Sequence, residues 1–374
     1  MVIARRDLIS EKSVSIVHTV SRTVRRAWLM GDDPLSKKNF DHRKSWVKSR
    51  LIHLSRQFSI EVCGYAIMCN HTHLVLRNRP DFTDLWTPYE VATRWWQLFP
   101  KRRDSRGNPL KPKDHELDII LFDKKTGESL GRLQELRTRL SSISWFMRCL
   151  NEHIARKANW EDRCTGRFCG VPPRQGRFKS VELLDQAAVL ACMAYVDLNP
   201  IHAGMAKTPE TSDYTSAQDR IYAAISRKKL AHLRETYHKE KSSGKPGSLN
   251  QIETEFVNKY KRRDAWLSPI NKWPYDKPID AYASFMNVEL EEYLSILDWT
   301  GKQHRSDKSG QIPRHLEPIL KRMDIETKAW LRTVKQFDNW FYRVAGRVEQ
   351  LSQAAQKLGK KWLAGKTGAR TAFT

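Results

Sequence analysis

The sequence predicts an α+β fold that carries an insertion and is followed by a mainly helical C-terminal region. Near the N-terminus, short alternating apolar segments typical of strands flank a segment with helical apolar spacing. Prolines and charged loop residues then interrupt this pattern over residues 80–130. Beyond residue 226 the chain becomes more basic and its apolar spacing is mostly helical. We therefore expect a first domain over residues 1–226, including the insertion, and a separate region over residues 227–374.

The N-terminal elements are predicted in the order strand, helix, strand, strand. Residues 13–22 alternate apolar and polar side chains, as a half-buried strand does. Residues 43–58 repeat apolar side chains at helical spacing. Residues 60–70 and 71–78 follow as two apolar strands joined by a tight connection. This order indicates a sheet with a helix on one face.

The following segments are predicted to be mostly helical. Within the insertion we expect a short helix near 88–99 and a mobile basic loop over 101–113. An amphipathic helical pattern covers 132–160, either continuous or with one break at Ser141–Ser144. Residues 181–199 are rich in alanine and leucine and end at a proline, which predicts one helix across the whole segment.

The net charge points to a polyanionic partner. Lys plus Arg total 66 against 42 for Asp plus Glu, a formal charge of +24, and neutralising phosphates releases condensed counterions. Ribosomal and RNA-processing proteins share this property, so charge alone indicates nucleic acid and nothing finer. No apolar run could span a membrane and no secretory signal is visible, which predicts a cytoplasmic, nucleoid-associated protein without a membrane partner.

The cysteine pattern favours reduced thiols. None of the six cysteines forms a C-x-x-C pair, and small buried thiols are the better interpretation. A zinc site built from Cys63, Cys69, Cys164 and Cys169 is the alternative, although zinc pairs usually lie closer in sequence.

His71 and His73 are the candidate metal ligands. They lie one residue apart on a predicted strand, so the period-2 alternation places both imidazoles on one face. There they can converge on one cation. The alternative interpretation is a pair of half-exposed histidines in a basic protein.

Tyr195 and Asn199 form the second candidate pair. Their i,i+4 spacing places the phenol and the carboxamide on one helix face. A phenol with an ordinary pKa near 10 is a poor nucleophile at neutral pH. A divalent metal on the attacked phosphate supplies the missing activation, and mixed imidazole and oxygen ligation suits Mn²⁺ or Mg²⁺. Taken alone, Tyr195 would be a packing tyrosine in most proteins.

Together these segments resemble a known family. The sequence contains, in the family's order, VHTVSRTVRRAWLMG, GYAIMCNHTHLVLR, RQGRFKS and YVDLNPIHAG. These strings resemble the motifs of the single-tyrosine HUH transposases similar to insertion sequence 200, and especially of the REP-associated tyrosine transposases. The resemblance covers most of residues 13–222.

The resemblance implies a ferredoxin-like HUH domain, an antiparallel sheet backed by helices. It implies that Tyr195 attacks a phosphate of single-stranded or hairpin DNA and forms a 5′-phosphotyrosine link, with a free 3′-hydroxyl. His71 and His73 carry over as metal ligands, with Asn199 as the third. A homodimer stays open as an assembly, because the insertion at 80–130 could alter the family's dimer geometry.

Basic residues near these motifs are the expected DNA contacts, because Arg and Lys bind phosphates. They are Arg22, Arg25, Arg26, Arg177 and Lys179. Trp28 and Phe178 are candidates for stacking on unpaired bases. The alternative is a solvated basic face with buried aromatic side chains. Asp197 points off the tyrosine face by its spacing, so it is not expected to accept the phenolic proton.

Three other functions stay open. A catalytically silent DNA-binding regulator on the same fold is favoured by the unusual residues at 169–175. A replication-initiator or relaxase nickase shares the histidine pair and the tyrosine chemistry, but the YVDLNP string does not suggest one. A metal-dependent RNA nuclease is more distant.

Overall fold

The structure is a computed structural model of the chain. It describes residues 13–23, 30–34, 36–122, 129–165, 178–242, 251–272, 284–303 and 327–373.

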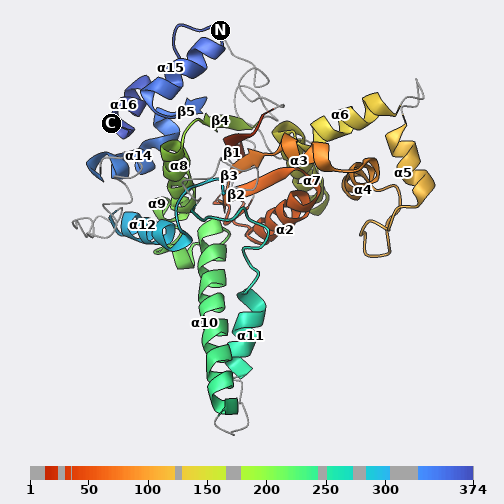
Figure 1. Ribbon diagram of the computed structural model, residues 1–374, viewed down its shortest axis with the longest axis horizontal. Coiled ribbons are helices and arrows are strands. Elements are labelled where there is room, and N and C mark those ends of the chain that lie inside the picture. The colour runs from red at the N-terminus through yellow and green to blue at the C-terminus, as the bar shows by residue number, and fades with distance from the viewer. Residues whose placement is uncertain are drawn as a thin grey trace.

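Within these residues, five strands form one sheet. The strands are β1 (Ser15–Arg22), β2 (Ile60–Ile67), β3 (His71–Asn78), β4 (Lys179–Leu183) and β5 (Val344–Ala345). Their order across the sheet is β2-β3-β1-β4-β5, and every neighbouring pair is antiparallel except β4 with β5. Helices back this sheet (Figure 1). The predicted α+β class is confirmed.

Helices make up most of the remaining described chain. They are α2 (His42–Gln57), α3 (Pro80–Leu85), α4 (Pro88–Leu98), α5 (Asp114–Leu121), α6 (Leu130–Leu140), α7 (Ile143–Glu161), α8 (Gln186–Asp197), α9 (Asn199–His202), α10 (Ser216–Ser242), α11 (Gln251–Tyr260), α12 (Leu290–Gln303), α14 (Thr327–Trp340), α15 (Val348–Lys357) and α16 (Lys366–Ala372). A 3₁₀ turn covers Pro209–Thr211. None of the described helices is both long and apolar enough to cross a membrane.

Two helical layers cover opposite faces of the sheet (Figure 1). On one face α2 and α7 pack together, and Thr19 of β1 contacts Met147 of α7. On the other face α8 packs against β2 and β3. There a Cβ added to Gly64 would lie 2.6 Å from the Met193 sulfur. The missing side chain at Gly64 therefore lets α8 approach the sheet closely.

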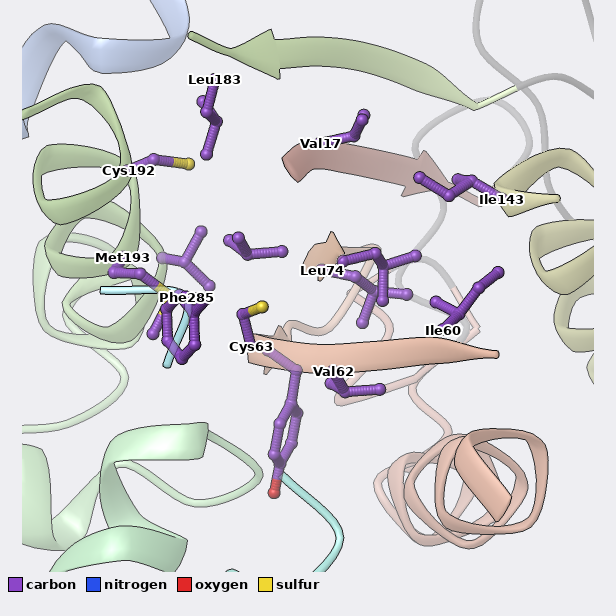
Figure 2. Close-up of a cluster of buried hydrophobic side chains, with 14 of the residues drawn as sticks. Val17, Ile60, Val62, Cys63, Leu74, Ile143, Leu183, Cys192, Met193 and Phe285 are labelled. Atoms are coloured by element: carbon purple, nitrogen blue, oxygen red, sulfur yellow. The ribbon is translucent and has the colours of Figure 1, made fainter. Parts of the chain in front are cut away.

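The core of the molecule lies between the sheet and these helices. Figure 2 shows Cys192 and Met193 of α8 facing the sheet, with Phe285 from the C-terminal region beside Met193. All three side chains are almost fully buried. Burial of this apolar surface is the main force that fixes α8 against the strands.

The helix predicted over 181–199 is wrong at its N-terminal end. Residues 179–183 form strand β4, which pairs with β1, and the helix begins only at Gln186. Asp185 caps that helix, because its carboxylate accepts a hydrogen bond from the backbone N–H of Ala188 at 2.9 Å. A short buried strand followed by an apolar helix reads as one apolar run, which explains the error.

The insertion is more ordered than predicted. It contains α3 and α5 in addition to the helix expected near 88–99. The loop between α4 and α5 is closed by Asp104, whose carboxylate accepts hydrogen bonds from the backbone of Arg106 and Asn108. After the insertion, α6 and α7 meet at Ser141 and Ser142, so the break considered at Ser141–Ser144 divides the helical pattern at 132–160 into two helices.

The C-terminal region joins the first domain at several places. Helix α10 runs without interruption across residue 226, and α10 with α11 projects away from the sheet (Figure 1). Strand β5 extends the sheet beside β4, and α14 packs on α8. The division at residue 226 stays a prediction.

Candidate active site

The two motif histidines lie side by side on the sheet face that α8 covers. They are residues 71 and 73 of β3, and their ring centroids are 4.8 Å apart. The register places His71 opposite Arg22 and His73 opposite Val20 of β1. Opposed residues of an antiparallel pair share a face. The predicted pairing of the imidazoles is confirmed in geometry, while their role as ligands stays a prediction.

A third histidine belongs to this cluster and was missed in the sequence. His18 of β1 is fully buried, and its Nε2 lies 2.9 Å from Nδ1 of His73. The two rings stack with an interplanar angle of 8°. A signal was present, because period-2 alternation from Ile16 and Val20 puts His18 on the same face.

Tyr195 lies over this histidine cluster. It occupies the last turn of α8, and its ring packs edge-on against His73 with centroids 5.4 Å apart. Helix α8 ends at Asp197, and Asn199 begins the short helix α9. Across this break Asn199 still hydrogen bonds the Tyr195 phenol. The side-chain nitrogen of Asn199 lies 3.5 Å from Nε2 of His73.

Asp197, which lies between Tyr195 and Asn199 in the sequence, has a structural role. Its buried carboxylate accepts hydrogen bonds from the Ser216 hydroxyl at 2.6 Å and from the Tyr293 hydroxyl at 2.5 Å. It also accepts from the backbone N–H of Ala217. These bonds tie α8 to α10 and α12, and they agree with the expectation that Asp197 points away from the tyrosine face.

Helix α14 covers the site from the C-terminal region. The buried ring of Phe337 stacks on Tyr195, with centroids 5.9 Å apart, and also contacts His18 edge-on. The next residue, Asp338, accepts a hydrogen bond from the Lys179 ammonium at 2.7 Å. These contacts join residues more than 140 positions apart in the sequence, and no local pattern indicates them.

The surroundings keep the imidazoles neutral and the phenol protonated. Burial lowers the pKa of His18 to about 4, and burial together with Arg22 lowers that of His71 to about 4. Burial and the neighbouring histidines hold the pKa of His73 well below its usual value. Burial and the Asp338 carboxylate raise the pKa of Tyr195 above its ordinary value.

The donor set fits a divalent cation. Nδ1 of His71 lies 2.5 Å from the side-chain oxygen of Asn70, and Nδ1 of His73 lies against His18. When each Nδ1 carries the proton, each Nε2 presents a lone pair, as in most histidine metal sites. Rotating the Asn199 amide would place its oxygen beside Nε2 of His73. In the part of the chain that the structure describes, no group of three His, Cys, Asp or Glu is arranged to hold a metal ion, so this set is two imidazoles with an amide.

The predicted DNA contacts are only partly described. Arg22 lies beside His71 in the sheet register, and Lys179 is engaged by Asp338. Phe178 is only 7% exposed, which favours the alternative of a buried aromatic over a ring that stacks on unpaired bases. Outside the described residues lie Arg25, Arg26, Trp28, Arg177 and the segment 169–175.

Comparisons with known proteins add one weak structural likeness. No protein-family model matches the chain, and no curated protein matches it. Among solved structures, a REP-associated tyrosine transposase bound to a REP hairpin matches with 12% identity and a TM-score of 0.31. The match covers 58% of this chain and 82% of that chain. Values this low carry no argument about function.

Proposed function

We propose that this chain is a single-tyrosine HUH transposase that cuts and rejoins single-stranded DNA. The observation that carries the proposal is the position of Tyr195, over His73 and hydrogen bonded to Asn199. Four sequence motifs in the family's order, which include all of these residues, support the same chemistry. The net charge of +24 suits a DNA substrate.

The proposed reaction is a transesterification. The phenolic oxygen of Tyr195 attacks a DNA phosphorus, a tyrosyl O–P bond forms and the P–O3′ bond breaks. The phenol loses its proton and the departing 3′ oxygen gains one, so atoms and charge balance. A later attack by a 3′-hydroxyl on the 5′-phosphotyrosine reverses these changes and rejoins a strand. No high-energy cofactor is consumed.

The residues around Tyr195 would hold the reacting groups. His71, His73 and Asn199 would bind Mg²⁺ or Mn²⁺, which supplies charge neutralisation at the attacked phosphate. Asn199 orients the phenol through its hydrogen bond. Arg22, beside His71, contributes positive charge where the phosphate would lie.

A catalytically silent DNA-binding regulator is the second candidate. The observation that favours it is the cover over the nucleophile, because Phe337 stacks on Tyr195 and burial raises the pKa of the phenol. A DNA strand could reach Tyr195 only if α14 moved away from the site. The intact set of two histidines, tyrosine and asparagine favours the enzyme, since binding alone requires none of these together.

Covalent adduct formation separates the two functions. Single-stranded hairpin oligonucleotides labelled at the 3′ or the 5′ end are incubated with the protein and Mn²⁺ or Mg²⁺. A 5′-phosphotyrosine link predicts a labelled adduct from the 3′-labelled strand and a released fragment from the 5′-labelled strand. Tyr195→Phe and His71→Ala should each abolish the adduct.

Tyr89→Phe is the matched control, because Tyr89 is half exposed on α4 and lies outside the site. It should form the adduct at the wild-type rate. Cleavage that survives Tyr195→Phe would mean that another group is the nucleophile. Tight binding with no cleavage of any hairpin from the source genome would establish the regulator instead.

A further inference from the structure

A second candidate site is a cavity of about 680 Å³ between α2, α7 and the 97–109 segment of the insertion. It shares no lining residue with the tyrosine site. Because α2 and α7 cover the sheet face opposite α8, the two sites are separate (Figure 1). A volume of this size lies in the range of pockets that bind nucleotide-sized ligands.

The cavity wall is strongly cationic. Five cations line it, against the single carboxylate of Glu152: Arg50, Arg103, Arg148, Arg156 and Lys157. Glu152 already accepts hydrogen bonds from Arg148 at 2.8 Å and from Arg156 at 3.4 Å. The remaining positive charge has no carboxylate in the lining to balance it. Such a wall favours an anion.

Two buried nitrogens in the wall have no hydrogen-bond partner. Nε of Arg50 and Nε2 of His53 make no hydrogen bond within the described residues. Both belong to α2 and are three residues apart, so they lie on one helix face. Since buried polar groups are normally paired, the unpaired Nε–H of Arg50 is available to an anionic ligand.

Burial and nearby positive charge lower the pKa of two histidines that line the cavity. Burial, together with Arg50 and Lys157, lowers the pKa of His153 to about 4. Burial and Arg50 likewise lower the pKa of His53. Both imidazoles are therefore neutral at physiological pH. Because His53 hydrogen bonds the Gln97 backbone, its unpaired Nε2 presents a lone pair and does not donate to an anion.

An aromatic ring stands beside these cations. Phe99 lines the cavity, is 44% exposed, and packs on Trp95 with ring centroids 4.8 Å apart. A supported, exposed ring next to phosphate-binding groups is the combination that binds unpaired nucleotides.

We propose that this cavity binds a nucleotide phosphate, with Arg50 donating to the phosphate oxygens and the base stacking on Phe99. The site does not depend on the chemistry of Tyr195, and it would operate equally in a silent DNA-binding protein. A phosphate within a DNA strand and a free mononucleotide share this chemistry, so the test must separate them.

The test uses the full chain carrying Tyr195→Phe, which prevents cutting. Binding of a fluorescein-labelled eight-nucleotide single strand is followed by anisotropy, and binding of deoxyadenosine monophosphate by calorimetry. Arg50→Gln and Arg103→Gln should each weaken binding about tenfold. The control is Arg56→Gln, because Arg56 is exposed on the same helix outside the cavity and loses the same charge.

A loss confined to the single strand identifies DNA as the ligand, and a loss in both assays identifies any nucleotide phosphate. Arg103 lies on an exposed loop, so its variant remains informative if Arg50→Gln fails to fold. The proposal is overturned if both cavity variants bind within twofold of the parent, or if Arg56→Gln weakens binding as much as they do.

Discussion

At the scale of single residues, the candidate site depends on buried groups that orient one another. His18 contacts Nδ1 of His73, and Asn70 contacts Nδ1 of His71, so both Nε2 atoms are left for a cation. On the other side of the site, Asp338 forms an ion pair with Lys179, and its carboxylate raises the pKa of the Tyr195 phenol. The histidine pair follows from strand alternation, and His18 could have been found the same way. Asp338 could not, since only the tertiary packing of α14 brings it there.

Buried His18 should make the protein sensitive to acid. Its folded pKa of about 4 lies below the ordinary value of 6.5, so the unfolded state binds more protons between these values. This contribution to stability is complete above pH 6.5 and is lost as the pH falls towards 4. Its size is on the order of 3 kcal/mol. Urea unfolding at pH 7, 5.5 and 4.5 should show a shallower pH dependence for His18→Asn than for wild type. Equal slopes would contradict the burial argument.

Neutralising Asp338 should make the phenol easier to ionise. The carboxylate raises the pKa of Tyr195, so Asp338→Asn removes a negative charge that opposes phenolate formation. The pH dependence of single-turnover adduct formation should shift towards lower pH, and DNA binding should tighten. Asp298→Asn, on an exposed part of α12, is the control for charge alone. An unshifted profile in Asp338→Asn would show that this carboxylate does not influence the nucleophile.

At the scale of elements, the position of the tyrosine depends on how α8 packs on the sheet. Strand alternation predicts β2 and β3 closely, but it misplaces the start of α8, because β4 and α8 form one apolar run. The close approach at Gly64 is also invisible in the sequence, where a glycine inside a strand can equally mark a bulge. The packing of α8 is therefore the part of the site that needs the structure.

Gly64→Ala should disturb the tyrosine helix. The added methyl would lie 2.6 Å from the Met193 sulfur in a fully buried position. Overpacking of this kind costs about 1–3 kcal/mol, and the displaced α8 should slow adduct formation. Met193→Val in the same chain shortens the opposing side chain and should recover part of both losses. Chemical denaturation and adduct kinetics provide the measurements. A fully stable and active Gly64→Ala protein would contradict the close packing.

At the scale of the whole molecule, the C-terminal region shares the core of the first domain. The change in composition near residue 226 predicts a boundary, yet α10 passes through it and β5 joins the sheet. Phe285 packs against α8, and the Tyr293 hydroxyl donates to the buried carboxylate of Asp197. Composition reflects the charge of exposed residues, so it does not indicate contacts that depend on a few buried side chains.

A fragment ending at residue 226 should therefore fail to fold cooperatively. The fragment lacks α12 and α14, so α8 would be exposed and the Asp197 carboxylate would lose its hydrogen bond from the Tyr293 hydroxyl. We expect a broad thermal transition and binding of a hydrophobic dye, as in states without fixed packing. A sharp cooperative transition in this fragment would show that residues 1–226 form an independent domain.

The most direct test of the central claim is to locate the covalent bond. The adduct formed on a 3′-labelled hairpin with Mn²⁺ is trimmed with nuclease and digested with protease, and tandem mass spectrometry identifies the modified peptide. The account predicts a nucleotide joined through its 5′ phosphate to Tyr195. A nucleotide on any other side chain would contradict it, even if the DNA is cut.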